Sequence, residues 1–178
     1  MKLQYKSEII KSMTWLGQKP DTIFLGQAIG YPGHAMSGTV EGVPTKKLYE
    51  LPVIEELQMG ISTGLALSGF VPITCYPRFD FLILAMNQLV NHLDKMQTMS
   101  KGEKRPKVII RTSIGSKTPL DAGPQHTQNH TEAFKRMLTE VEVVLLEEPE
   151  QIFPAFEKAY SKKGSTLLIE YGEYYSTK

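Results

Sequence analysis

The feature that most constrains the fold is a succession of short, continuously apolar runs separated by amphipathic segments. The runs are TIFLGQ (22–27), VPITCY (71–76), KVIIRTS (107–113), VEVVLLEE (141–148) and STLLIEY (165–171). Strands that are apolar throughout, rather than on alternate residues, are typical of parallel sheets covered by helices on both faces. We therefore predict an α/β fold of three layers, α/β/α, with a mainly parallel sheet.

Between these runs, apolar residues recur at helical spacing. The clearest stripe consists of Leu82, Ala85, Leu89, Leu93 and Met96, which predicts a helix over residues 80–99. Further helices are expected at 3–16, 53–69, 130–139 and 149–163. The stretch 28–47, rich in glycine, is expected to form a long loop of the kind that often carries function. A length of 178 residues suits one domain, which we assign to residues 1–178.

Composition and charge exclude several classes of protein. Lys and Arg number 20 against 19 Asp and Glu, which gives no electrostatic basis for binding nucleic acid or an anionic membrane surface. A single cysteine, Cys75, allows no internal disulfide and fits a reducing compartment. No window approaches the roughly 18 consecutive apolar residues of a membrane span, and the charged N-terminus is unlike a signal peptide. We expect a cytoplasmic protein.

Several common catalytic signatures are absent from the sequence. It has no GxGxxG after the first strand, no GxxxxGK[ST] and no GxSxG. The four histidines, His34, His92, His126 and His130, show no familiar zinc spacing with the one cysteine. His126 and His130 could share a helical turn, but no carboxylate lies close by in sequence, so we expect no metal site in this chain.

A series of motifs resembles a known family. The series runs PVIE (52–55), a glycine-spaced helix, GFVPI (69–73), a Phe-x-x-x-Ala-x-x-Gln-x-x-Asn helix (81–91), MSKG (99–102), KVIIRTSIGS (107–116) and GPQHTQ (123–128). In this order and spacing it resembles the pyrimidine-binding domain of thiamine-diphosphate enzymes. That domain occurs in the β subunits of 2-oxo acid (pyruvate and acetoin) dehydrogenases, in transketolase and in deoxyxylulose-phosphate synthase. The resemblance covers about residues 20–172.

The resemblance implies roles for particular side chains. Glu55 would hydrogen-bond the ring nitrogen of the coenzyme's aminopyrimidine, and a desolvated carboxyl favours sharing a proton there. Phe81 would pack against the same ring, with Val53 and Pro77 as weaker candidates for the cofactor pocket. His126 would lie near the substrate and hold an oxygen or transfer a proton.

Each role has a structural alternative. Glu55 could be an acid that stabilises a helix N-terminus, Phe81 a core side chain and His126 a solvated loop residue. His34, in the glycine-rich loop, could also reach the site, whereas His92 is expected to serve packing or an interface.

The resemblance also implies a partner. The Gly-Asp-Gly and Asn-Asn elements that hold the diphosphate and Mg²⁺ in the family are absent from this sequence. A diphosphate-binding, α-type subunit would supply them, and the expected assembly is a heterotetramer. The glycine-spaced face Gly60–Gly64–Ser68 and the helix at 80–99 are candidate contact surfaces.

The chain departs from the family in three respects, one of which is that the acidic residue that often follows the Pro-Ile strand is replaced around Cys75. It ends after the pyrimidine-binding domain, without the family's C-terminal domain, and it has Tyr49-Glu50-Leu51-Pro52 where Asp-Thr-Pro is usual. We expect an enzyme subunit that takes part in decarboxylating a 2-oxo acid and transferring the acyl group. A split transketolase acting on a ketose and a non-catalytic assembly protein of the same fold are the alternatives.

Overall fold

The computed structural model describes residues 4–34, 36–117 and 121–178, and its framework is one six-stranded sheet. The strands are β1 (Thr22–Gly26), β2 (Leu48–Glu50), β3 (Val71–Tyr76), β4 (Ile109–Ile114), β5 (Glu142–Leu145) and β6 (Thr166–Tyr171). Their order is β2-β1-β3-β4-β6-β5, and every neighbouring pair is parallel. The predicted fold class is confirmed, with a sheet that is parallel throughout.

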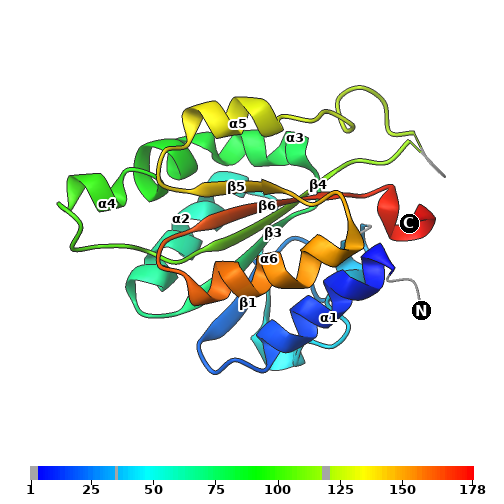
Figure 1. The fold of residues 1–178 in the computed structure, drawn as a ribbon, viewed down its shortest axis with the longest axis horizontal. Coiled ribbons are helices and arrows are strands. Elements are labelled where there is room, and N and C mark those ends of the chain that lie inside the picture. The colour runs from blue at the N-terminus through cyan, green and yellow to red at the C-terminus, as the bar shows by residue number, and fades with distance from the viewer. Residues whose placement is uncertain (1–3, 35, 118–120) are drawn as a thin grey trace.

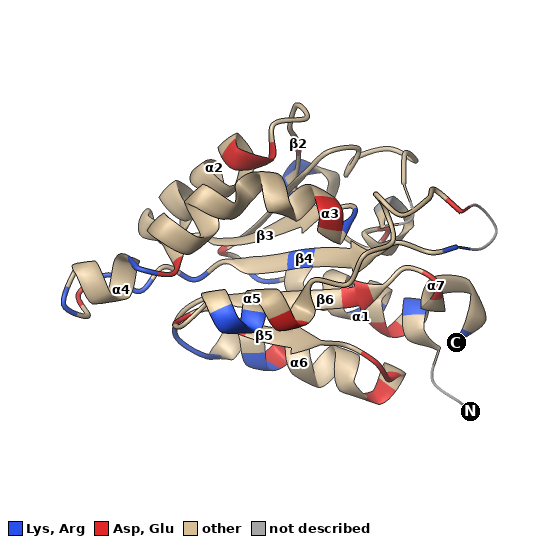
Figure 2. Ribbon diagram, turned by 90° about the horizontal axis from the view of Figure 1, so that it is seen from above, with Lys and Arg blue, Asp and Glu red and all other residues tan. Residues whose placement is uncertain are grey.

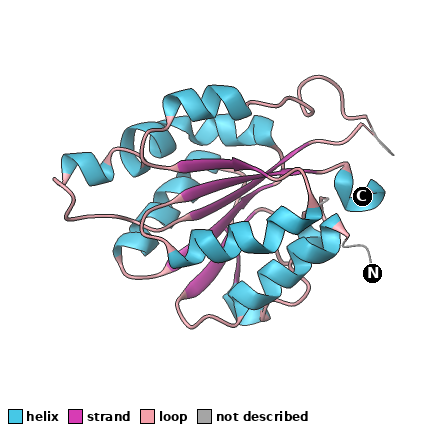
Figure 3. Cartoon of the chain, viewed as in Figure 1, coloured by secondary structure: helices cyan, strands magenta, loops and turns pink. Residues whose placement is uncertain are grey.

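Helices cover both faces of the sheet (Figures 1 and 3). The α-helices are α1 (Tyr5–Gly17), α2 (Glu55–Leu67), α3 (Phe79–Leu82), α4 (Met96–Met99), α5 (Thr131–Met137), α6 (Pro149–Ser161) and α7 (Tyr174–Thr177). Three short 3₁₀ turns are η1 (Ser37–Thr39), η2 (Thr45–Lys47) and η3 (Ile83–Ala85), and η4 (Asn87–Leu93) is a π-helix. No helix in the described part of the chain is long and apolar enough to cross a membrane.

Each face of the sheet has its own hydrophobic core. Helices α1 and α6 pack side by side on one face, where Ile9, Phe24 and Phe156 are fully buried. Helices α2, α3 and α5 cover the other face, which buries Met59 and Phe134. Burial on both faces explains why the strands are apolar runs rather than alternating patterns.

The helix expected at 80–99 is interrupted. Four residues of its stripe, Leu82, Ala85, Leu89 and Leu93, are buried in the core, and Met96 is half-buried. The segment passes from α3 through η3 and the π-helix η4 to α4. The wider turns accompany Asp94, whose buried carboxylate accepts backbone N–H groups of Thr139, Glu140 and Val141 at 2.8–3.1 Å. Burial opposes the charge, but Lys95 and these amides outweigh it and lower the pKa of Asp94 to about 2. These hydrogen bonds fix the position of Asp94, directly after the π-helix, and we relate the irregular helical geometry to that constraint.

A buried ion pair joins the middle of the sheet to its surroundings. Arg111 on β4 and Glu170 on β6 are both 0% exposed, and the guanidinium Nε and Nη2 donate to the two carboxylate oxygens at 2.7 and 2.9 Å. Arg111 Nη2 also donates to Thr39 Oγ1 in η1 at 3.0 Å, and the Tyr175 hydroxyl of α7 donates to Glu170. One charged pair thus connects two strands, the loop after β1 and the last helix.

The two ends of the described chain meet. The Tyr5 backbone N–H donates to the Lys178 carbonyl at 3.0 Å, and the Tyr5 hydroxyl donates to the Leu146 carbonyl at 2.7 Å. Both ends lie at the edge of the sheet where the parallel strands finish (Figure 1).

Candidate functional site

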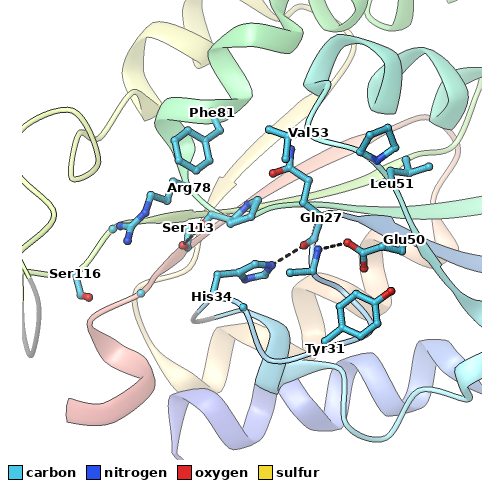
Figure 4. Close-up of a pocket in the computed structure, with 16 residues that line it drawn as sticks. Gln27, Tyr31, His34, Glu50, Leu51, Val53, Arg78, Phe81, Ser113 and Ser116 are labelled. Atoms are coloured by element: carbon cyan, nitrogen blue, oxygen red, sulfur yellow. Dashed lines mark hydrogen bonds between the residues drawn. The ribbon is translucent and has the colours of Figure 1, made fainter.

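A cavity of about 560 Å³ opens at the carboxyl ends of the strands (Figure 4). In doubly covered parallel sheets this is the edge at which ligands bind. Its walls come from the ends of β2 and β4 and from the segments that follow β1, β2, β3, β4 and β6. They comprise Gln27, Ala28, Tyr31, Gly33, His34, Glu50, Leu51, Pro52, Val53, Pro77, Arg78, Phe81, Ser113, Gly115, Ser116 and Gly172. The parallel order of the strands therefore brings together, at one edge of the sheet, segments that are far apart in the sequence.

Three of the residues expected to bind a cofactor line this cavity. Phe81 and Val53 lie on the same side of the site in Figure 4, and Val53 is 73% exposed. Pro77 is buried at the end of β3. Together with Leu51 and Pro52 they form an apolar wall, which suits the face of a flat ring.

Glu55 is the first residue of α2 and lies behind the cavity wall rather than in it. It is 5% exposed, and its Oε1 accepts a hydrogen bond from Gln27 Nε2 at 3.0 Å. Within the described residues its other oxygen, Oε2, accepts none. The helix N-terminus favours a negative charge at this position, as the structural alternative holds. Because Gln27 lines the cavity, the carboxylate is one hydrogen bond removed from it.

His126 lies against Phe81. The two rings meet edge to face with centroids 5.6 Å apart, although the His126 ring is not part of the cavity wall. Nδ1 lies 3.0 Å from the Ala122 carbonyl oxygen, which can only accept, so Nδ1 carries the hydrogen. With the hydrogen on Nδ1, Nε2 is the acceptor in the neutral form of the ring.

His34 reaches the cavity from the glycine-rich loop, the position that the sequence left open. Its Nδ1 accepts the Met36 backbone N–H at 3.2 Å, so Nε2 carries the hydrogen and donates to the Gln27 carbonyl at 2.7 Å (Figure 4). Burial lowers the pKa of His34, and the positive charges of Arg111 and Arg78 act in the same direction. The hydrogen bond that Nδ1 accepts from Met36 and the lowered pKa both favour the neutral imidazole, although the bond to the Gln27 carbonyl acts in the opposite direction.

The neutral state of His34 predicts a pH-dependent stability. Its folded-state pKa lies below the value of 6.5 for an unperturbed histidine, so the unfolded chain takes up a proton first as the pH falls. The stabilisation is complete above about pH 6.5 and is lost as the pH falls toward the folded-state pKa, with a slope of at most about 1.4 kcal/mol per pH unit. Urea denaturation at pH 7.5, 6.5 and 5.5 measures this slope.

The variant His34→Gln should flatten that slope, whereas His92→Gln should leave it as in the wild type, because His92 is exposed on η4. Equal slopes for wild type and His34→Gln would contradict the assignment.

The other histidines lie outside the cavity. His130 packs edge to face on Phe79 and has Nε2 3.5 Å from Asp80 Oδ1. His92, expected at a packing contact or an interface, is exposed. In the described ranges no group of three or more His, Cys, Asp or Glu side chains is arranged to hold a metal ion.

The polar cavity residues that were not foreseen from the sequence include Gln27, Glu50 and Arg78. Each comes at or within two residues of the end of a strand, which is the signal that could have identified them. Glu50 folds the loop over the cavity, since its carboxylate accepts the backbone N–H groups of Ala28, Ile29 and Gly30, the latter two at 2.9 and 3.3 Å.

Known proteins share both the sequence and the fold. The chain is 30% identical over 97 residues to the pyruvate dehydrogenase E1 component subunit beta of Rickettsia bellii, an alignment covering 54% of this chain and 29% of that protein. It is 30% identical over 133 residues to the 3-methyl-2-oxobutanoate dehydrogenase subunit beta of Mycobacterium tuberculosis, covering 75% of this chain and 37% of that one. The chain thus spans well under half the length of these curated relatives.

A solved structure described as a split gene transketolase, inactive β4 tetramer, superposes with a TM-score of 0.63 over 95% of this chain and 51% of that one. At 16% sequence identity the likeness shows a shared fold.

The family model described as the transketolase pyrimidine-binding domain matches residues 13–175, nearly the whole chain. This confirms the resemblance carried by the sequence motifs, in a family associated with thiamine diphosphate. The chain therefore belongs to the family of transketolase pyrimidine-binding domains.

Proposed function

We propose that this chain is the pyrimidine-binding subunit of a heteromeric thiamine-diphosphate-dependent enzyme that decarboxylates a 2-oxo acid and transfers the acyl group. The observation that carries the proposal is the buried Glu55 carboxylate beside an apolar and aromatic cavity, at the ligand-binding edge of the sheet. The relatives named as β subunits of 2-oxo acid dehydrogenases support the choice of substrate class.

The groups around the cavity suit an aminopyrimidine. Glu55 Oε2 accepts no hydrogen bond from the described residues and is not a fully buried atom, so it is available to a ligand although the residue as a whole is 5% exposed. A protonated ring nitrogen would supply the missing donor. Phe81, Val53 and Pro77 offer the apolar surface that the face of the ring requires.

Thiamine diphosphate, when bound, supplies the carbanion chemistry, and the protein supplies orientation and electrostatics. In this proposal Glu55 shares a proton with the ring nitrogen, and Phe81 packs on the ring, a contact worth about 0.5–1.5 kcal/mol beyond area burial. His126, with Nδ1–H fixed by the Ala122 carbonyl, presents Nε2 as the group that holds or moves a proton on the substrate side.

A partner is part of the proposal. We assign the diphosphate and Mg²⁺ to an α-type subunit, in an assembly we infer to be a heterotetramer. The curated relatives are β subunits by name, and the split transketolase of the same fold is described as inactive when it consists of four β chains. A β-type chain that needs an α-type partner is consistent with both.

Helix α2 offers a surface for that partner. After the two glutamates of its first turn it carries no charge (Figure 2), and Leu57 and Leu67 are 45% and 47% exposed. The face expected at Gly60–Gly64–Ser68 is open at Gly64, where an added Cβ would meet nothing within 4 Å, and at the exposed Ser68, whereas Gly60 lies beside the Gln88 side chain. Leu84 of η3, 63% exposed, adds apolar area outside α2.

A split transketolase acting on a ketose is the second candidate, because the matching family and the solved structure of the same fold both carry the name transketolase. The same site would bind the same coenzyme, and the donor would differ. Turnover of pyruvate against turnover of a ketose by the reconstituted complex separates the two.

The proposal predicts that coenzyme binding requires the complex. Titration calorimetry with thiamine diphosphate and Mg²⁺ should show weak or no binding to the isolated chain and tight binding after co-purification with a diphosphate-binding subunit encoded nearby. In that complex Phe81→Ala should raise the dissociation constant several-fold, because a ring contact is lost.

The matched control is Phe153→Ala, a phenylalanine that packs on Trp15 on the other face of the sheet and should not affect binding. Tight, stoichiometric binding by the isolated chain would reject the need for a partner. Absence of binding by the complex would reject the cofactor.

A further inference from the structure

Arg78 lines the cavity, yet neither the fold nor the coenzyme accounts for its charge. We propose that the Arg78 guanidinium binds the oxyanion of the substrate, a carboxylate or a phosphate, and so determines which donors the site accepts. The inference rests on the proposed function, because it names the substrate class of that same site.

The backbone around Arg78 is fixed. Arg78 connects the end of β3 to α3, and Ser113 Oγ at the end of β4 donates to the preceding Pro77 carbonyl at 2.7 Å. From this anchored position the side chain extends along the cavity wall toward Ser116 (Figure 4). A guanidinium held in this way is preorganised for a ligand rather than free in solvent.

Most of the hydrogen-bonding capacity of Arg78 is unused. Of the five N–H groups of a guanidinium, one on Nη1 donates to the His126 carbonyl at 3.2 Å, and Arg78 forms no ion pair with any residue in the described ranges. Arg111 is the contrast, since its guanidinium is fully buried on Glu170 and Thr39. Bidentate recognition of an oxyanion requires planar N–H donors that no carboxylate of the protein already occupies, and Arg78 offers such donors.

Gly115 makes room for this arrangement. A Cβ at this position would overlap both the Arg78 Nη1 atom and the His126 carbonyl. The glycine thus allows the guanidinium and the histidine segment to share one space at the end of β4. The close approach indicates a shaped site rather than a surface arginine that happens to face a hollow.

The charges around the cavity leave Arg78 uncompensated. Glu50 is the carboxylate in the wall, and its oxygens already accept three backbone N–H groups from Ala28, Ile29 and Gly30. Burial and the Met36 N–H that Nδ1 accepts favour the neutral ring of His34. An anion beside Arg78 would lie next to Phe81 and His126, where the proposed chemistry takes place.

Kinetics of the reconstituted complex test the assignment. Arg78→Gln should raise KM for the anionic donor about 10- to 100-fold, the loss expected for hydrogen bonds to a charged group, with kcat and the coenzyme dissociation constant within about two-fold of wild type. Arg78→Lys should give a KM between those of wild type and Arg78→Gln, because lysine keeps the charge but lacks the planar set of N–H donors of arginine. Arg136→Gln removes the same charge from the exposed surface of α5 and should change nothing.

Comparing pyruvate with a ketose phosphate as donor shows whether the oxyanion is a carboxylate or a phosphate. A KM for both donors within two-fold of wild type in Arg78→Gln would overturn the proposal.

A second readout does not depend on turnover. The Nε–Hε resonance of Arg78, assigned by its absence in Arg78→Gln, should shift when pyruvate or inorganic phosphate is added to the complex and stay unchanged with the uncharged analogue acetone. No shift with either anion would also overturn the role of Arg78. A complex that binds anions at Arg78 yet binds no thiamine diphosphate would instead refute the proposed function alone.

Discussion

Replacing Glu55 by glutamine is expected to lower kcat of the reconstituted complex by at least about 100-fold, the scale of general acid–base catalysis. Glutamine has nearly the same shape, and its carbonyl oxygen can still accept the hydrogen bond from Gln27. It cannot accept a proton or carry the charge that stabilises a protonated ring nitrogen. The substitution therefore removes the proposed chemistry while leaving the packing of α2 in place. Steady-state kinetics with pyruvate and with a ketose measures the loss.

Glu56→Gln is the matched control. Glu56 lies in the same helical turn and is exposed, with Oε1 accepting a hydrogen bond from Asn87 at 3.1 Å. It loses the same charge at the same helix terminus, so an effect of the helix dipole alone would appear equally in both variants. Near-normal turnover in Glu55→Gln, or equal losses in the two variants, would refute the catalytic assignment.

Replacing Arg111 by methionine is expected to lower the free energy of unfolding by about 3–5 kcal/mol, because Glu170 would be left as a buried charge without its partner. For a chain of this length such a loss corresponds to a decrease in melting temperature of roughly 6–20 °C. The Tyr175 hydroxyl would still donate to Glu170, which is a weaker compensation than a bidentate guanidinium. Circular dichroism during thermal and urea unfolding gives both quantities.

The double variant Arg111→Met with Glu170→Met separates the lost pair from lost packing. Replacing both charges by apolar side chains of similar volume is often neutral, so the double variant should recover most of the stability. Arg136→Met controls for an exposed arginine. A single variant as stable as wild type, or a double variant no better than the single one, would contradict this account.

The sheet could be foreseen from the sequence because its strands are buried on both faces and hence uniformly apolar. Strand β2 was missed, since its three residues lie at the sheet edge after a glycine-rich loop and carry no apolar run. The irregular helix at 79–99 escaped prediction because Asp94 is anchored by amides 45 to 47 residues away. Local patterns do not encode contacts of that range.

The candidate site also has residues that the sequence could indicate and one whose role depends on long-range contacts. Glu55, Phe81, Val53, Pro77 and His126 could be named because family motifs mark their positions. The role proposed for Arg78 depends on a carbonyl 48 residues further along the chain and on the space left by a glycine, and neither is visible in a local window. The contacts of Arg78 with distant residues therefore had to come from the structure.

The adjacency of Tyr5 and Lys178 makes this domain suitable for circular permutation. A short linker from Lys178 to the N-terminal segment would follow an existing hydrogen bond, and new ends could be opened in the turn at 101–104 between α4 and β4. No strand would lose a neighbour. The new ends would leave from the opposite edge of the sheet, so that any fused tag or reporter would stand clear of the cavity.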